Sequence, residues 1–272
     1  MQSTAIPVPT FSDLLRSWRR TRKHSQWALS DMAGVSQRHL SFLESGRSAP
    51  SREMVLRLSQ ALELPLREQN GLLQAAGFAA VYPENPIDAE SLAHARQALD
   101  IMLTHQEPYP VIVVDRNWNL LLSNEANLRL FNAFTDINTL WEDIGGQTPN
   151  VARATLHPAG FRPHIRNWDA FAGYFLRQLG EELATNPFNR QARELLDEVA
   201  NYPGMPASTD VPTGAAPLLS LELEKDGTPL RLFTMISTFG TPLDVTLQEL
   251  RIETFFPADD VTDRFLHELA GH

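Results

Sequence analysis

The feature that most constrains the fold is a dense alternation of helix-starting and helix-ending residues in the first eighty positions. Serine stands where a helix would begin at Ser25, Ser36 and Ser51, and glycine follows the expected helix ends at Gly34 and Gly46. Serine side chains cap the N-termini of helices, and glycine readily adopts the left-handed conformation that ends them. Apolar residues recur three or four positions apart between these points. The pattern therefore predicts five short helices joined by short turns.

The segment GVSQRHLSFLESGR, residues 34–47, predicts a turn followed by a helix that begins after Ser36. In a helix-turn-helix, the second helix lies in the major groove of DNA, and residues near its start contact the bases. Gln37 suits a bidentate pair with adenine, and Arg38 suits a bidentate pair with guanine. The other DNA contacts expected from this helix are made by Ser36, Ser41 and Phe42.

The distribution of charge favours DNA as the partner of the first part of the chain. The whole chain has a net charge of -10, but residues 1–80 contain ten Lys and Arg against six Asp and Glu, a net of +4. Residues 81–272 contain the remaining 13 basic and 27 acidic residues, a net of -14, and would have to face away from DNA. The residues expected to contact phosphates are Gln26 and Arg47, with unspecific charge from Arg19, Arg22 and Lys23.

The apolar pattern changes beyond residue 81. Residues 82–107 predict a proline-containing linker followed by an amphipathic helix. The strand-like patterns that follow lie at residues 111–114 and 119–123 and, after about eighty residues of helical pattern, at 219–224, 230–239 and 250–256. This order predicts an α+β domain in which helices cover one face of a five-stranded antiparallel sheet. The expected division is a DNA-binding domain at 1–81, a connection at 82–107 and a second domain at 108–272.

The motifs of the first part resemble a known DNA-binding family. The pairs SQ at 25–26 and PS at 50–51, with GVS at 34–36 and LESGR at 43–47, resemble the phage-repressor-type (XRE/Cro) helix-turn-helix over roughly residues 11–76. Ser30 departs from the pattern, which usually has alanine there, but a small residue still permits close helix approach. The resemblance implies a lambda-repressor-like five-helix domain that binds DNA.

A second resemblance covers nearly the whole chain. The stretches YPVIVVDRNWNLLLSNEAN, LHPAGFRPHIRNW and STFGTPLDVTLQELRIETFFPADD resemble MmyB-like transcription regulators. In those proteins a helix-turn-helix precedes a PAS-like ligand-binding domain. The resemblance implies a sensor of a small hydrophobic molecule, with fatty-acid-like ligands as the leading suggestion.

A PAS-like pocket would lie between the sheet and its helices and would be mostly apolar. The residues expected in its wall are Trp168, Phe171, Phe175, Phe233, Met235 and Phe239. The last three lie on one face of the 230–239 strand, although each apolar residue is equally consistent with an ordinary core. For an anionic head group the candidates are His157 and Arg166, and Asn167 is a possible hydrogen-bond donor. Arg166 is also consistent with a solvated charge at a helix end.

The sequence argues against an enzyme. The chain has no cysteine, which excludes disulfides, thiolate zinc sites and cysteine nucleophiles. The ending HELAGH places its histidines five positions apart, whereas the zinc-binding HExxH motif needs four. No GxSxG, GxxxxGK[ST] or GxGxxG motif occurs. We therefore expect no catalytic residues, no metal and no cofactor, apart from a bound fatty acid or similar effector.

These patterns predict a cytoplasmic transcription regulator without a membrane segment, since no apolar run reaches the length of a signal peptide or membrane span. A single small reading head makes few contacts with DNA, so the protein is expected to bind operator DNA as a homodimer. Binding of a hydrophobic small molecule to the second domain would then modulate operator binding, through the helix expected at 88–105. The alternative is a second domain that serves protein interaction or dimerisation without a ligand.

Overall fold

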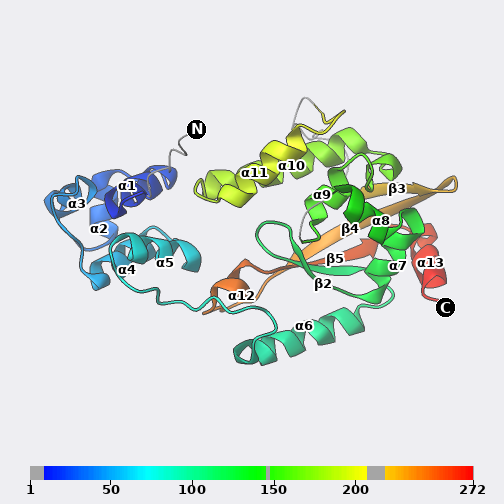
Figure 1. Cartoon of the computed structure of the whole chain (residues 1–272), viewed down its shortest axis with the longest axis horizontal. Coiled ribbons are helices and arrows are strands. Elements are labelled where there is room, and N and C mark those ends of the chain that lie inside the picture. Colours follow the sequence, from blue (N-terminus) through cyan, green and yellow to red (C-terminus); the bar gives the residue numbers. More distant parts are fainter. Residues whose placement is uncertain (1–8, 145–147, 207–217, 272) are drawn as a thin grey trace. The chain divides into compact units, whose positions relative to one another are not determined.

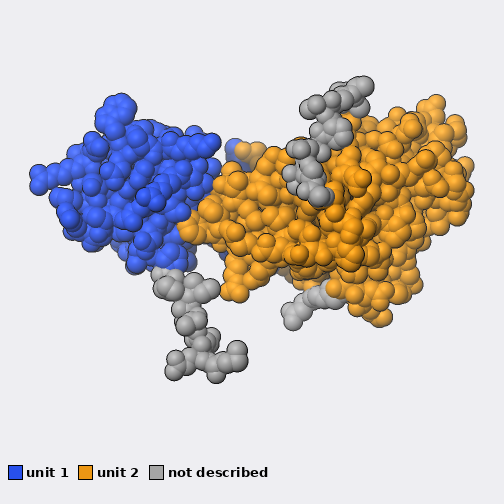
Figure 2. Space-filling model, turned by 90° about the horizontal axis from the view of Figure 1, so that it is seen from above, with its two compact units in different colours: residues 1–86, 241–248 blue, residues 87–240, 249–272 orange. Residues whose placement is uncertain are grey.

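The structure, a computed structural model, describes residues 9–144, 148–206 and 218–271 (Figure 1). The chain forms two compact units, coloured separately in Figure 2. The first contains residues 1–86 and 241–248, and the second contains residues 87–240 and 249–272. The chain therefore returns to the first unit between two segments of the second.

The first unit is helical, and its five expected helices are confirmed. They are α1 (Phe11–Thr21), α2 (Gln26–Met32), α3 (Gln37–Glu44), α4 (Arg52–Ala61) and α5 (Leu66–Ala75). Thr10, Ser25, Ser36 and Ser51 cap the first four helices through their hydroxyl groups. The apolar faces meet in one core, in which Leu15, Leu29, Leu40, Leu43 and Leu58 are fully buried. Burial of these faces is what stabilises helices that would be too short to form alone.

Residues 241–248 complete the first unit beside α5 and include most of α12 (Val245–Glu249). The backbone N–H of Leu66 donates to Gln248 Oε1 at 2.7 Å, which satisfies a donor in the first turn of α5 that Pro65 cannot cap. Asn85 Nδ2 donates to Asp244 Oδ2 at 2.8 Å. The segment is therefore attached to the first unit by specific hydrogen bonds.

The second unit is built on one five-stranded antiparallel sheet, as the sequence predicts. Its strands are β1 (Val111–Val114), β2 (Leu120–Ser123), β3 (Leu221–Lys225), β4 (Thr228–Ser237) and β5 (Arg251–Pro257). Their order in the sheet is β2-β1-β5-β4-β3. The last strand in sequence therefore lies at the centre, between β1 and β4.

Helices occupy the long interval between β2 and β3 and both ends of the second unit. They are the 3-10 turns η1 (Glu90–Leu92) and η2 (Arg162–His164) and the helices α6 (Ala93–His105), α7 (Glu125–Phe134), α8 (Ile137–Ile144), α9 (Val151–Leu156), α10 (Trp168–Thr185), α11 (Arg190–Ala200) and α13 (Asp260–Leu269). One apolar cluster joins β1 to α9, α10 and α11, and within it the rings of Trp118 and Phe175 lie 4.6 Å apart. A second cluster joins β3 and β4 to α7 and α13. The sheet is thus covered by helices at the face where the cavity described below is found.

Candidate functional site

The turn between α2 and α3 has the geometry of a helix-turn-helix. Gly34 adopts a φ of +62°, a left-handed conformation that a residue with a Cβ adopts only with strain. Ser36 then accepts a hydrogen bond from the N–H of His39 at 3.2 Å, which fixes the start of α3. Leu29 of α2 and Leu40 of α3 are both fully buried in the same core. Caps and core together hold α3 in a defined orientation within the unit.

The outer surface of α3 carries the residues that the sequence suggests for reading bases. Gln37 and Arg38 are exposed at its first turn, and Ser41 and Phe42 are half-buried one turn later. The guanidinium carbon of Arg38 lies 5.4 Å from the centre of the Phe42 ring. Arg47 is exposed just beyond the helix. The structure therefore leaves this set of side chains open to a partner.

Gln26, expected at a phosphate, and Arg19, expected to supply unspecific charge, both form hydrogen bonds with a buried carboxylate. Glu44, at the end of α3, is 3% exposed. Arg19 donates to its two oxygens at 2.5 and 2.9 Å, and Gln26 Nε2 donates to Oε2 at 2.8 Å. Burial would raise the pKa of Glu44, but the hydrogen bonds from Arg19 and Gln26 hold that pKa below its ordinary value. In this structure Arg19 and Gln26 therefore join α1, α2 and α3.

Arg22 also donates hydrogen bonds within the first unit, whereas the side chain of Lys23 is exposed. The guanidinium of Arg22 donates to the backbone oxygens of Leu62 at 3.0 Å and Glu63 at 3.1 Å. Lys23 is exposed, in a turn where its φ is +57°. Arg22, like Arg19, therefore uses its guanidinium in hydrogen bonds within the unit, in this case at the C-terminal end of α4.

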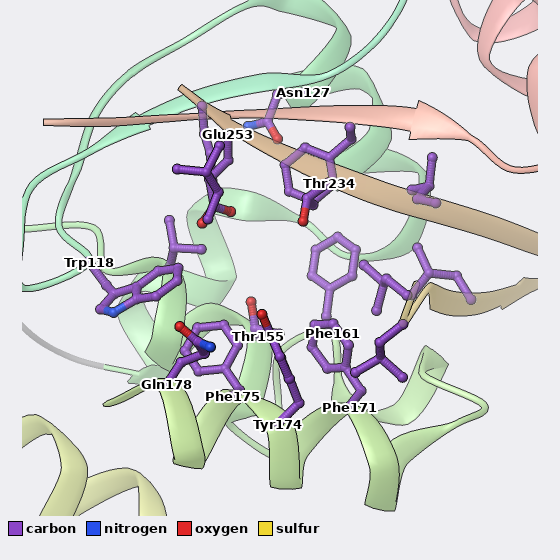
Figure 3. Close-up of a pocket in the computed structure, with 18 of the residues that line it drawn as sticks. Trp118, Asn127, Thr155, Phe161, Phe171, Tyr174, Phe175, Gln178, Thr234 and Glu253 are labelled. Atoms are coloured by element: carbon purple, nitrogen blue, oxygen red, sulfur yellow. The ribbon is translucent and has the colours of Figure 1, made fainter. Parts of the chain in front are cut away.

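A cavity of about 360 Å³ lies between the sheet and the helices of the second unit (Figure 3). From α10 it is lined by Phe171, Tyr174, Phe175 and Gln178, and α7, α9, β1 and the segment after residue 217 contribute further residues. The aromatic side chains of α10 lie along one side of the cavity in Figure 3. A cavity of this size, mostly apolar with a few polar groups, is typical of small-molecule sites.

The pairing of β4 with β5 determines which side chains form the sheet wall of the cavity. Thr234 pairs with Phe255, and Ile236 pairs with Glu253, so these residues share a face. All four line the cavity, as does Arg251. The strand residues between them point to the opposite face of the sheet.

The expected wall residues divide between the two faces. Phe171 and Phe175 line the cavity. Phe233 lies on the other face of β4, where its ring stacks on Phe256 with centres 5.6 Å apart. Met235 is 57% exposed, and neither it nor Phe239 is among the residues that line the cavity. The side-chain alternation of the strand is therefore as expected, but the cavity is on the face of Leu232, Thr234 and Ile236.

The residues expected at a head group make contacts outside the cavity lining. Arg166 forms an ion pair with Glu224 at 3.2 Å. Asn167 binds β3, since its Nδ2 donates to the Ser220 oxygen at 2.7 Å. The ring of His157 packs edge-on against that of Tyr202. Trp168, which was expected in the wall, also lies outside the cavity lining, and its Nε1 donates to the Gly204 oxygen at 3.0 Å. In the structure these side chains form contacts that connect loops and strands, and they do not line the cavity.

The polar side chains that do line the cavity include three that the sequence did not single out. Trp118, Asn127 and Glu253 are 5%, 3% and 7% exposed, respectively. Trp118 adopts a φ of +65° in the turn before β2. Glu253 lies at the centre of the sheet, on β5. No sequence signal marked Glu253 as buried, because Arg251 and Glu253 alternate with apolar residues as they would in a half-exposed strand.

Within the described ranges, no group of three or more His, Asp or Glu side chains is placed to hold a metal ion. His267 Nε2 lies 3.9 Å from Asp263 Oδ1 on α13, and His272 lies outside the described residues. Among the same described residues, no helix has the length and hydropathy that crossing a membrane requires.

Two family models match the chain. The model of the MmyB-like transcription regulator ligand binding domain matches residues 95–269, and a helix-turn-helix model matches residues 15–69. No curated protein matches the chain significantly. The first model covers the cavity and the whole sheet, and the second covers α2 and α3.

Proposed function

The chain belongs to the MmyB-like transcription regulators, and from this premise we propose that it binds operator DNA as a homodimer and responds to a long apolar molecule in its cavity. The cavity is the observation that carries the proposal. Its sheet wall and the aromatic side chains of α10 border a space large enough for a fatty-acid-like chain. A five-stranded antiparallel sheet with a ligand site under its helices is also the arrangement of a PAS-like sensor. A regulator of this kind would act in the cytoplasm, beside its operator.

DNA recognition is proposed to rest on the start of α3. Gln37→Ala and Arg38→Ala should each weaken binding to the specific operator by about 1–3 kcal/mol and relax the base preference at one position. Binding to random DNA should change much less, because these side chains would contact bases rather than phosphates. Gel-shift titrations of each variant against operator and scrambled duplexes measure both quantities. His39→Ala, on the same helix, is the control and should retain the operator preference.

Equal losses on operator and scrambled DNA would show that Gln37 and Arg38 bind phosphates only. The same titrations test the dimer, because a homodimer reads two half-sites about one helical turn apart. Shortening the duplex to one half-site should therefore reduce the affinity of the wild type. If one half-site binds as tightly as the full operator, the dimer proposal fails.

Ligand binding is proposed to reach the DNA-binding unit through the connection between β4 and β5. Both strands line the cavity, and residues 241–248 between them belong to the first unit. Asp244 is 5% exposed, accepts a hydrogen bond from Asn85, and caps α12 by accepting from the N–H of Thr246 at 2.8 Å. A ligand that favours one conformation of β4 and β5 would thus alter a segment of the unit that contacts DNA.

We expect an apolar ligand to change the operator affinity of the wild type by about fivefold or more. Asp244→Ala should bring this change below about twofold, while leaving ligand affinity intact. Leu243→Ala is the matched control, because Leu243 is 76% exposed and adjacent in sequence. The measurement is a gel-shift titration with and without dodecanoate. A full ligand response in Asp244→Ala would contradict the proposed route.

The alternative is a second unit that recognises a protein or only dimerises. Native mass spectrometry of the purified full-length protein separates the two functions. Additional mass of a few hundred daltons that leaves on denaturation would support a ligand. A protein that carries no additional mass and binds none of the apolar probes would favour the alternative.

A further inference from the structure

The cavity contains two buried hydrogen-bond donors without a partner. Among the described residues, Trp118 Nε1 and Asn127 Nδ2 are the only buried side-chain nitrogens or oxygens that have no hydrogen-bond partner. Both residues line the cavity, and both are more than nine-tenths buried. A buried donor without an acceptor lowers the stability of a protein, so native proteins rarely retain one without a reason. Of the two, the Asn127 amide lies nearer the Glu253 carboxyl in Figure 3, and an acceptor supplied by a ligand at that point would satisfy it.

Glu253 lies on the same side of the cavity. Figure 3 shows its carboxyl group between Trp118 and Asn127 in that view, with the aromatic side chains of α10 across the cavity. The residues paired with Glu253 across the sheet, Ile112 on β1 and Ile236 on β4, are apolar. The residues directly beside Glu253 on both neighbouring strands are therefore apolar.

The charged groups that face Glu253 are Arg251, on the same strand, and Glu182, on α10. Arg251 forms an ion pair with Glu182, and its guanidinium lies over the Trp118 ring at 5.6 Å. Of the described cavity residues from β1, β4, α7 and α9, none is charged; Tyr174 of α10 adds a phenol. Arg251 is thus already paired with a carboxylate that is not Glu253.

Burial raises the pKa of Glu253 to about 7; the positive charge of Arg251 opposes this increase, and the negative charge of Glu182 adds to it. Near neutral pH a large share of the protein therefore has a protonated Glu253, which can donate one hydrogen bond. An anionic head group beside the ionised form would be repelled, whereas an uncharged acceptor would not.

We propose that Glu253 and Asn127 form a head-group site that takes an uncharged hydrogen-bond acceptor, such as the ester, amide or protonated acid end of an amphiphile. The proposal rests on the proposed function, since it assumes that the cavity holds an apolar chain. A carboxylate ligand would bind only to the protein in which Glu253 is protonated. The site therefore selects the chemistry of the ligand's polar end.

The test compares methyl dodecanoate with dodecanoate on the full-length protein, by isothermal titration calorimetry at pH 6.0 and pH 8.5. The ester should lose less affinity than dodecanoate between the two pH values, because it carries no charge and loses only the hydrogen bond that protonated Glu253 donates. Dodecanoate should bind at least about tenfold more weakly at pH 8.5, because Glu253 must then take up a proton. Glu253→Gln, which mimics the protonated acid, should abolish this loss.

Asn127→Leu removes one donor with little change in volume and should weaken ester binding by roughly three- to tenfold. Asn132→Leu, the same change at an exposed position of the same helix α7 outside the cavity lining, is the matched control and should not weaken it. Circular dichroism checks that each variant is folded, and Asn127→Leu keeps the test decisive if Glu253→Gln does not fold.

The outcomes distinguish the two proposals. If neither probe binds the wild type, the ligand-binding function itself fails. If dodecanoate binds equally well at both pH values, or if Asn132→Leu weakens the ester as much as Asn127→Leu, the apolar cavity stands and the head-group site is wrong.

Discussion

Replacing Arg19 with alanine is expected to lower the free energy of unfolding of the helix-turn-helix unit by about 3–5 kcal/mol. The Arg19 side chain is 12% exposed, and Glu44 is 3% exposed. The variant would leave the Glu44 carboxylate buried without the cation that donates two hydrogen bonds to it. A buried charge that loses its partner destabilises far more than the pair itself contributes. Urea unfolding combined with amide hydrogen exchange in α1 to α3 measures the loss.

Arg57→Ala is the matched control for this prediction. Arg57 also pairs with a carboxylate, that of Glu53, but the two side chains are 45% and 80% exposed. Such an exposed pair contributes at most about 0.5 kcal/mol. The double variant Arg19→Met, Glu44→Leu should recover most of the loss, because no unpaired charge remains. Similar small losses in Arg19→Ala and Arg57→Ala would show that the pair does not hold the unit together.

The pair of Arg19 and Glu44 makes the free energy of unfolding depend on pH in the acidic range. Because folding lowers the pKa of Glu44, its contribution is complete above the ordinary carboxyl pKa and is lost as the pH falls through the lowered value. The difference in unfolding free energy between the wild type and Arg19→Ala should therefore shrink below the ordinary pKa of 4.5. Denaturant titrations at a series of acidic pH values follow this difference.

The sequence predicted the elements of the first unit well because their signals are local. A serine cap or a glycine after a helix acts through neighbouring backbone groups, so Ser36 and Gly34 mark the turn before α3 without knowledge of the rest. The placement of Arg19 and Gln26 could not be predicted in the same way. Their partner, Glu44, lies 25 and 18 positions further along the chain and is buried only when three helices pack.

In the second unit, alternation predicted the strands but not their faces. A period of two identifies two sets of residues, and only tertiary contacts decide which set meets the helices. On β5 both sets are covered near the centre, since Ile252 is 4% exposed and Glu253 is 7% exposed. The alternation of apolar and charged residues would ordinarily place Glu253 in solvent. Its burial between β1 and β4 therefore distinguishes this sheet from a half-exposed one.

Replacing Thr234, on the cavity face of β4, with tryptophan should strongly weaken ligand binding. Thr234 lines the cavity, so an indole at this position would fill space that an apolar chain would occupy. Aromatic residues suit strands, which makes a folded variant the expected outcome. Loss of about 100 Å² of ligand burial corresponds to roughly 2.5 kcal/mol, or a weakening of dodecanoate binding by about 60-fold.

Met235→Trp is the matched control, because Met235 is the next residue on the same strand, is 57% exposed, and lies outside the cavity lining. It should bind dodecanoate as the wild type does and retain the ligand-dependent change in operator affinity, whereas Thr234→Trp should lose both. The reverse result would place the ligand on the face of Phe233 and Met235, as the alternation of the sequence alone suggested. Because the two variants differ by one position in a single strand, the comparison decides which face of the sheet binds the ligand.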